Sequence, residues 1–296
     1  MVFFVTGVLR VTRLPNNPII RPNMDDRMGS NINGPSLIRI PEWIENPLGK
    51  YYLYFGHHDG KYIRLAYSDD LIGPWHTYRP GTLQLDDSHF TGHIGSPDVH
   101  VDDSSRQIRM YFHGSDTATG QGGKQSTRLA ISVDGLSFLA NRELLGNPYW
   151  RVFRWKRWCY ALGMPGVFYR SKNGVSNFEQ GPTLFSTNMR HSAVLVEGDD
   201  LHVYYTDVGD APERIRRTTI SLSDHWANWL LSKPVDILSP QEIWEGANQP
   251  VAPSKRGLIE DPVNQLRDPA IFREDGHTYL LYSVAGESGI AVAKLT

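Results

Sequence analysis

A pair of short strands joined by a polar turn recurs five times along this chain of 296 residues. The clearest copy spans residues 266–283, where Leu-Arg-Asp-Pro-Ala-Ile-Phe precedes an Asp-Gly turn and a second run, Thr-Tyr-Leu-Leu-Tyr. Asp-Gly between two such runs is a strong hairpin signal. The other first strands begin near residues 35, 97, 149 and 191. Five copies of one hairpin restrict the chain to a repetitive fold made of strands.

Further strand-like segments follow each hairpin, so each unit reads as a four-stranded meander. Small sheets of four strands repeated around an axis form a β-propeller, and we predict an all-β, five-bladed β-propeller. The alternative is a β-sandwich, which does not need five copies of the same hairpin. The fifth unit ends after its third strand, and residues 2–12 have β composition. We therefore predict that this N-terminal strand completes the last unit and closes the ring.

We interpret residues 1–296 as one domain, because the repeats span nearly the whole chain. The long gap between the fourth and fifth units, residues 230–265, is rich in proline and glycine and is predicted to be a functional insertion. The predicted blades lie near residues 31–80, 93–142, 147–186, 190–230 and 266–296.

The charge balance and the single cysteine exclude several classes of protein. A net charge of −2, from 30 basic and 32 acidic residues, argues against a nucleic-acid partner. Cys159 has no partner for an internal disulfide and lies in an apolar strand, where a buried, inert thiol is expected. No stretch approaches the ~20 apolar residues of a membrane span. The first residues lack a basic leader, so we expect a cytoplasmic protein unless a leader was removed. The oligomeric state stays open.

The strand order of a propeller predicts which residues meet on one face. The start of each innermost strand and the end of the second strand lie on the same side, and histidines gather there. The carboxylates on this side do not occupy turn positions, so we predict the functional site on this face. Its candidate residues are Asn33, His57, His58, His93, Asp98, His113, Arg190, His191, Arg267, Asp268 and Glu287.

Three motifs carry a resemblance to a known family. They are Asp268-Pro269-Ala270-Ile271, the hairpin strand Tyr51-Tyr52-Leu53-Tyr54-Phe55 with its preceding glycine, and Ser68-Asp69-Asp70-Leu71 before Trp75. Over nearly its whole length the chain resembles the five-bladed-propeller glycoside hydrolases, the arabinanase and β-xylosidase family 43 with the fructosidases, as a divergent member. The resemblance implies glycosidic-bond hydrolysis by three acidic residues around a central cavity. One serves as base or nucleophile, one orients or tunes a pKa, and one is the general acid.

The match to that catalytic pattern is incomplete. Arg267-Asp268-Pro269 matches an Arg-Asp-Pro motif, and Ser96-Pro97-Asp98-Val99 matches an Ala-Pro-Asp-Val blade opening. Blade one has Gly34 where an aspartate would stand, and blade three opens without a carboxylate. Blade four has Arg190-His191 where the general-acid glutamate is expected.

Glycoside hydrolysis needs a proton donor and a carboxylate on the opposite face of the sugar. Arg267 beside Asp268 would keep that aspartate ionised, and an apolar neighbour such as Trp244 would raise the pKa of Glu245. We therefore predict Asp98, Asp268 and Glu245 as catalytic residues and Trp244 as a platform on which a sugar stacks. Glu260 and His191 are the alternative general acids.

These observations favour a glycosidase that degrades plant or algal glycans or oligosaccharides and requires no cofactor. Several imidazoles on one face also suit a central divalent metal, which would fit a metal-dependent lyase or lactonase. A propeller that keeps the pocket but lacks the base at Gly34 would instead be a non-catalytic carbohydrate-binding protein. Fold alone does not decide among these functions.

Overall fold

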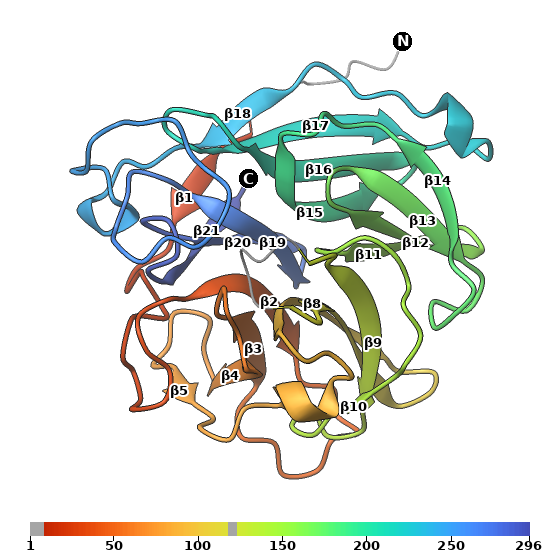
Figure 1. Ribbon diagram of the computed structural model, residues 1–296, viewed down its shortest axis with the longest axis horizontal. Helices are drawn as coiled ribbons and strands as arrows, with labels where there is room; N and C mark the ends of the chain where they lie inside the picture. The colour runs from red at the N-terminus through yellow and green to blue at the C-terminus, as the bar shows by residue number, and fades with distance from the viewer. Residues whose placement is uncertain (1–8, 118–122) are drawn as a thin grey trace.

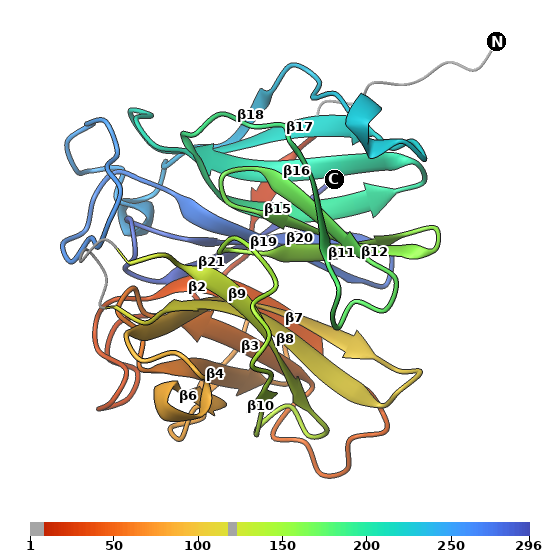
Figure 2. The same ribbon diagram turned by 45° about the vertical axis from the view of Figure 1, so that its right-hand side comes forward.

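The structure is a computed structural model that describes residues 9–117 and 123–296. Its described residues form five antiparallel sheets arranged around a common centre (Figures 1 and 2). The predicted all-β, five-bladed β-propeller is thus confirmed. In blades one to four the strands are paired in chain order, from an innermost strand outwards.

The bounds of the strands follow the predicted repeats closely. Blade one contains β2 (Asn33–Arg39), β3 (Tyr51–Gly56), β4 (Tyr62–Ser68) and β5 (His76–Thr77), with β6 (Leu83–Gln84) also paired to β4. Blade two contains β7 (His93–Asp102), β8 (Gln107–Ser115), β9 (Ser126–Ser132) and β10 (Leu139–Ala140). Blade three contains β11 (Arg151–Trp155), β12 (Trp158–Gly163), β13 (Val167–Ser171) and β14 (Glu179–Thr183). Blade four contains β15 (Met189–Glu197), β16 (Asp200–Asp207), β17 (Ile215–Ser221) and β18 (Val235–Leu238).

Blade five is built from both ends of the chain. It contains β19 (Arg267–Glu274), β20 (His277–Ser283) and β21 (Ile290–Leu295), and its outer strand is β1 (Val11–Arg13). Figure 1 shows β1, in red, beside β21, in blue, and Val11 is paired with Leu295. The prediction that an N-terminal strand closes the ring is confirmed for these residues, while residues 2–8 of the predicted strand lie outside the described part. This pairing covers the open edge of β21.

The outer strand of blade four lies inside the segment predicted as an insertion. β18 pairs with β17, whereas the earlier segment Trp226–Asn228 forms a short 3-10 helix, η2. This segment does not form the outer strand because its aromatic side chains pack against blade three. Trp229 is buried, and its ring centroid lies 5.2 Å from that of Tyr160 and 5.3 Å from that of Phe168 in blade three. The part of the insertion without a strand is therefore shorter than predicted, residues 239–266.

Successive side chains of a strand point alternately to its two faces, and this explains how each blade packs against both of its neighbours. In β3, Tyr51, Leu53 and Phe55 join a hydrophobic cluster with blade five, whereas Tyr52 and Tyr54 join a cluster with blade two. Successive side chains of a strand point to opposite faces, so a strand that is apolar at every position can bury both faces. The three further blade pairs are held by equivalent clusters, and Cys159 is buried in the one between blades two and three, as expected.

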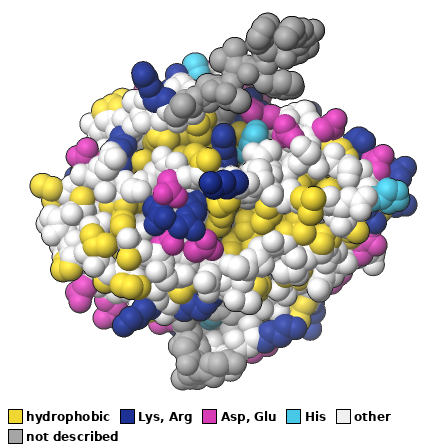
Figure 3. All heavy atoms as spheres, turned by 90° about the horizontal axis from the view of Figure 1, so that it is seen from above, with side chains coloured by type: hydrophobic (Ala, Val, Ile, Leu, Met, Phe, Trp, Pro, Cys, Tyr) yellow, Lys and Arg dark blue, Asp and Glu magenta, His cyan; other side chains and the backbone are white. Residues whose placement is uncertain are grey.

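The outer surface is mixed in character. On the face seen in Figure 3, basic and acidic side chains are interspersed among polar and hydrophobic ones. Among the residues described, no helix has the length and apolar character needed to cross a bilayer. The other short 3-10 helices are η1 (Leu85–Asp87) and η3 (Ile243–Glu245).

Candidate functional site

The innermost strands of blades one, two and five bend at the same point. The pairing register shifts around Gly34, Ser96 and Asp268, and each of these residues precedes a proline. Their φ angles are +63°, +41° and +46°, and that of Tyr149, just before β11, is +60°. A bulge re-aims side chains, and non-glycine residues held in the left-handed region cluster at functional sites.

Ser96, Tyr149 and Asp268, at three of these positions, line one small polar pocket. Its volume is about 10 Å³, which is about what a single water molecule requires. Most of the histidines and carboxylates predicted for this face meet here. The pocket is lined by Asn33, His57, His58, Gly95, Ser96, His113, Tyr149, His191, Asp268 and Glu287.

Asp268 and His191 form the closest charged contact in the pocket. Nδ1 of His191 lies 2.5 Å from Oδ1 of Asp268, and the hydroxyl of Ser283 donates to Oδ2 at 3.1 Å. Burial opposes the charge on Asp268, but His191, Arg190 and Arg267 outweigh it, so the pKa of the aspartate is lowered. Burial also lowers the pKa of His191, against the attraction of Asp268. At neutral pH the pair is therefore a carboxylate beside a neutral imidazole.

Tyr149 lies between two histidines. Its ring centroid is 4.0 Å from that of His113 and 4.8 Å from that of His191. Burial raises the pKa of the phenol, so it stays protonated, and burial lowers the pKa of His113 well below its ordinary value. Nδ1 of His113 is buried and has no hydrogen-bond partner among the described residues. Sequence reasoning missed Tyr149, although it occupies the same position before its strand as Ser96 and Asp268.

Glu287 forms the other acidic wall of the pocket. Asn31 donates to its Oε2 at 2.7 Å, and Arg267 and His58 contact its Oε1 at 3.1 and 3.2 Å. Burial would raise the pKa of Glu287, but His58 and Arg267 outweigh burial and lower it. Glu287 is therefore an ionised, firmly held carboxylate.

A buried ion network supports this wall from behind. Glu213 is fully buried and lies 3.3 Å from both Arg190 and Arg267. The two predicted arginines therefore position Asp268 and Glu287 rather than line the pocket. Sequence reasoning missed Glu213, because it lies in a loop at 213, away from any strand start.

Asp98, which was predicted as a catalytic residue, does not line this pocket. Arg151 donates to the backbone carbonyls of Pro97 and Ser192 at 2.8 Å and to that of Pro35 at 3.4 Å. These carbonyls lie directly beyond the bends, so the guanidinium crosses the propeller axis. Asp98 lies 3.6 Å from Arg151 and accepts from the backbone N–H of Val152 at 2.7 Å. It lines a second cavity, of about 310 Å³, among the five innermost strands.

Glu245 and Trp244 also lie away from the pocket. Glu245 is buried and accepts from Arg13 of β1 at 2.8 and 2.9 Å and from the hydroxyl of Tyr282 at 2.9 Å. Trp244 is partly buried against the hydrophobic cluster of blades four and five. The predicted acid Glu245 and the predicted sugar platform Trp244 therefore lie outside this pocket, and this part of the insertion is held to the strand that closes the ring. Glu260, the alternative acid, is exposed in the same loop.

Two more of the predicted histidines flank the pocket without completing a metal site. His93 packs against His113 with ring centroids 5.8 Å apart, and Nδ1 of His57 accepts from the backbone N–H of Asp59 at 2.9 Å. Within residues 9–117 and 123–296, no three His, Cys, Asp or Glu side chains converge as metal ligands.

Gly34 cannot be exchanged for an aspartate without displacing blade two. A Cβ at this position would lie 2.8 Å from Cα of Ser96 and 2.9 Å from its hydroxyl oxygen. The left-handed φ of +63° also disfavours any side chain. Blade one therefore has no room for a side chain where the resemblance led us to expect an aspartate, because its backbone approaches blade two closely.

We compared the chain with known proteins. No family model matches the sequence. The uncharacterized protein R118 of Acanthamoeba polyphaga mimivirus is 37% identical to this chain over an alignment 327 positions long. The alignment covers 98% of this chain and 91% of R118.

Solved structures share the architecture at much lower identity. A candidate glycoside hydrolase from Parabacteroides distasonis has a TM-score of 0.69 at 12% identity, with 97% of each chain covered. CoXyl43, a family 43 β-xylosidase/α-arabinofuranosidase from a compost metagenome, has a TM-score of 0.60 at 13% identity, covering 98% of this chain and 94% of its own. The chain therefore belongs to the same family as the mimivirus protein R118, and its fold is the five-bladed β-propeller found in family 43 glycoside hydrolases.

Proposed function

We propose that the protein is a glycoside hydrolase in which Asp268 and His191 activate water at the centre of the propeller. The observation that carries the proposal is the contact of 2.5 Å between a buried, ionised aspartate and a neutral imidazole in a pocket of one-water size. Solved proteins with this fold include the β-xylosidase/α-arabinofuranosidase CoXyl43, whose complex holds xylotriose.

The arrangement supports direct attack by water. A neutral His191 accepts a proton from the water, and the Asp268 carboxylate stabilises the imidazolium that forms. The water oxygen bonds to the anomeric carbon as the bond from that carbon to the leaving oxygen breaks. The leaving oxygen departs on the far side of the sugar and takes its proton from water at the mouth of the pocket, while the protonated phenol of Tyr149, beside His191, is a hydrogen-bond donor to the attacking water. Attack by water in one step inverts the configuration at the anomeric carbon.

The small size of the pocket bears on the substrate. A space of about 10 Å³ admits water but no sugar ring, so the sugar binds at the mouth of the pocket, against the histidines of blades one and two. Plant or algal glycans and oligosaccharides are the substrates we propose for this mouth.

A carbohydrate-binding protein without activity is the second candidate. The close approach of Gly34 to Ser96 favours it, because blade one has no room for the carboxylate that the family pattern requires there. In that case the buried charges would serve only to hold hydroxyl groups of a sugar.

The test is hydrolysis of aryl glycosides and of plant and algal oligosaccharides by the wild type, Asp268→Asn and His191→Asn. Loss of a general base or its partner costs about 10²–10⁴-fold in rate, so we expect a loss of that size in both variants. Asp275→Asn is the matched control: the same exchange in the same blade, at an exposed hairpin turn with φ of +50°.

The outcomes separate the two candidates. Hydrolysis that both variants lose and the control keeps, with inversion seen by NMR of the product, supports the hydrolase and its mechanism. Full activity in Asp268→Asn refutes this site. Saturable sugar binding by a wild type that turns over none of the substrates supports the binding protein.

A further inference from the structure

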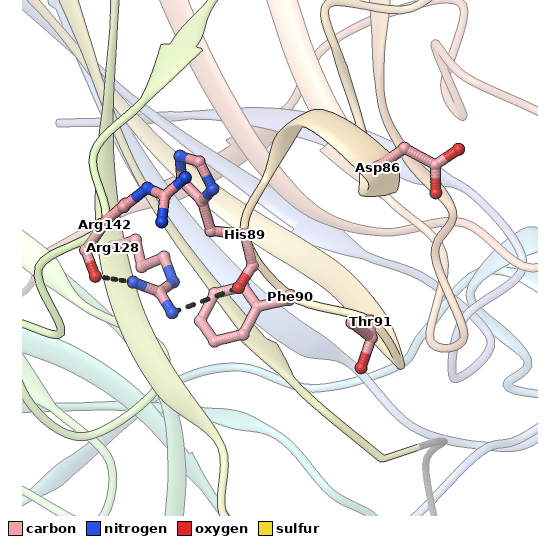
Figure 4. Close-up of a pocket in the computed structure, with 6 residues that line it drawn as sticks. All are labelled: Asp86, His89, Phe90, Thr91, Arg128 and Arg142. Carbon is pink, nitrogen blue, oxygen red and sulfur yellow. Dashed lines mark hydrogen bonds between the residues drawn. The ribbon is translucent and has the colours of Figure 1, made fainter.

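A third pocket, on the outer side of blade two, contains two arginines, Arg128 and Arg142, that form no ion pair with a carboxylate of the described residues. Its volume is about 590 Å³. It lies between the segment that leads from η1 to β7 and the strands β9 and β10 (Figure 4). It is lined by Asp86, His89, Phe90, Thr91, Arg128 and Arg142.

Arg128 is the buried cation of this pocket. Only 8% of its surface is exposed, and its guanidinium lies over the ring of Phe90, 4.5 Å from the centroid. Its two terminal nitrogens donate to the backbone carbonyls of Arg142 and His89. Its Nε is buried and has no hydrogen-bond partner in the part of the chain that the structure describes. Arg128 also forms no ion pair with any described carboxylate; Asp116 attracts it only at longer range.

Burying a guanidinium costs free energy unless an opposite charge or a full set of hydrogen bonds compensates for it. Arg64 shows that carbonyls alone can hold a buried arginine in this protein, since its terminal nitrogens donate to the carbonyls of Asn31, Gly56 and Met28 while its Nε, like that of Arg128, has no partner among the described residues. Arg64, however, lines none of the cavities described above, whereas Arg128 lines an open one. The difference points to a ligand at Arg128.

One neighbouring side chain, Arg142, adds to the positive charge of the pocket. Arg142 is exposed and makes no side-chain ion pair with a described residue, and His89 is held with a φ of +61°. Figure 4 shows Arg128, Arg142 and His89 grouped together, with Asp86 on the far side of the pocket. The hydroxyl of Thr91 donates its proton to the carbonyl of Asp116 at 2.9 Å, so this hydroxyl can only accept a hydrogen bond and is not a donor for an anion.

We propose that this pocket binds an oxoanion group, a sulfate, phosphate or carboxylate, through Arg128 and Arg142. A planar guanidinium presents its donors in a fork that suits such oxygens, and the exposed Arg142 is free to move onto the anion. The volume leaves room for more than the anion, which suits an anionic group attached to a larger molecule such as an acidic sugar.

The pocket lies directly behind the wall of the central site. Phe90, on which Arg128 stacks, packs over Gly114, where an added Cβ would lie 2.4 Å from its Cδ2. Gly114 is the neighbour of His113, whose ring lines the central pocket. The proposal nevertheless stands on the charge of this pocket and does not depend on the hydrolase proposal.

The experiment is calorimetric titration of the full chain with sodium sulfate, sodium phosphate and sodium glucuronate at low ionic strength. We expect saturable binding of at least one of them, weakened by added sodium chloride because salt screens the attraction. Arg142→Gln, an exposed exchange that should not affect folding, is expected to weaken the binding about tenfold, and Arg128→Gln to abolish it. Arg154→Gln, an exposed arginine of blade three, is the control of equal charge and should bind as the wild type does.

Each outcome decides something. Preference for glucuronate identifies the carboxylate of an acidic sugar as the ligand group, and preference for inorganic phosphate or sulfate identifies a tetrahedral oxoanion. Absence of saturable binding for all three probes overturns the proposal. So does binding that Arg142→Gln and Arg154→Gln weaken equally, because such binding reports only net charge. If Arg128→Gln does not fold, the comparison of Arg142→Gln with Arg154→Gln still decides.

Discussion

Acid should destabilise this protein through His113 in particular. The imidazole is buried against Tyr149 and its Nδ1 has no partner among the described residues. Burial, and then the neighbouring His93 and His191, lower its pKa well below the ordinary value of 6.5. The folded protein therefore keeps His113 neutral at a pH where the unfolded chain has already taken up the proton.

The sign and the size of the change in stability with pH follow from this difference in the protonation of His113. Below pH 6.5 the unfolded state binds one more proton at this position than the folded state, so unfolding takes up a proton and falling pH favours it. One group that stays neutral changes the free energy of unfolding by about 1.4 kcal/mol per pH unit. Between pH 6.5 and 5.0 the loss from His113 alone is about 2 kcal/mol, a large part of a typical stability of about 5–15 kcal/mol.

The assay is urea unfolding followed by tryptophan fluorescence at several pH values from 8 to 5, on the wild type and His113→Phe. Phenylalanine keeps a ring beside Tyr149 and removes the titration, so we expect the variant to gain about 2 kcal/mol relative to the wild type between pH 6.5 and 5.0. His225→Phe, at an exposed position, is the control and should follow the wild type. A difference between wild type and His113→Phe that stays constant with pH would refute the reasoning.

Three further exchanges test the architecture. Gly34→Asp should destabilise the protein by about 1–3 kcal/mol through the clash with Ser96, without adding activity, and urea unfolding with an activity assay checks both. Glu245→Gln should lower the free energy of unfolding by about 3–5 kcal/mol, because it breaks the ion pair with Arg13, but it should leave the activity of the folded protein intact. If activity falls by more than the folded fraction does, Glu245 has a catalytic role after all. Arg151→Met should lower the melting temperature markedly, because three strand carbonyls and Asp98 lose their donor, and an unchanged melting curve would contradict its role on the axis.

The repeat of hairpins was sufficient to predict the fold, and the reason is local. A strand such as Tyr51–Gly56, apolar or aromatic at nearly every position, is only stable when both faces are covered, and a ring of blades covers both. The outer strands were harder to predict, because they are short and weakly patterned. Val235–Leu238 was taken for part of an insertion, since two tryptophans nearer to β17 suggested a strand there.

The candidate site was predicted in part, and the failures have a common cause. Strand order placed His191, Asp268 and Glu287 on one face, and the structure brings them together. Strand order could not reveal that Asp98, two positions past the bend at Ser96, lines the cavity among the innermost strands instead of the pocket at the bends. Nor could it reveal that Glu245 is held by Arg13, more than two hundred residues away in the sequence.

The bends explain why the chemistry of this propeller lies to one side of the axis. The ring offers five comparable positions at the strand starts, one from each blade, at 34, 96, 149, 191 and 268. Blades one and two approach each other so closely at Gly34 and Ser96 that only the smallest residues fit there. At the same level blades three to five supply larger side chains, Tyr149, His191 and Asp268, and Glu287 follows on the loop after β20. The close packing of two blades thus limits which of the five positions can carry a large polar side chain, and the proposed proton-transfer pair, His191 and Asp268, comes from the neighbouring blades four and five.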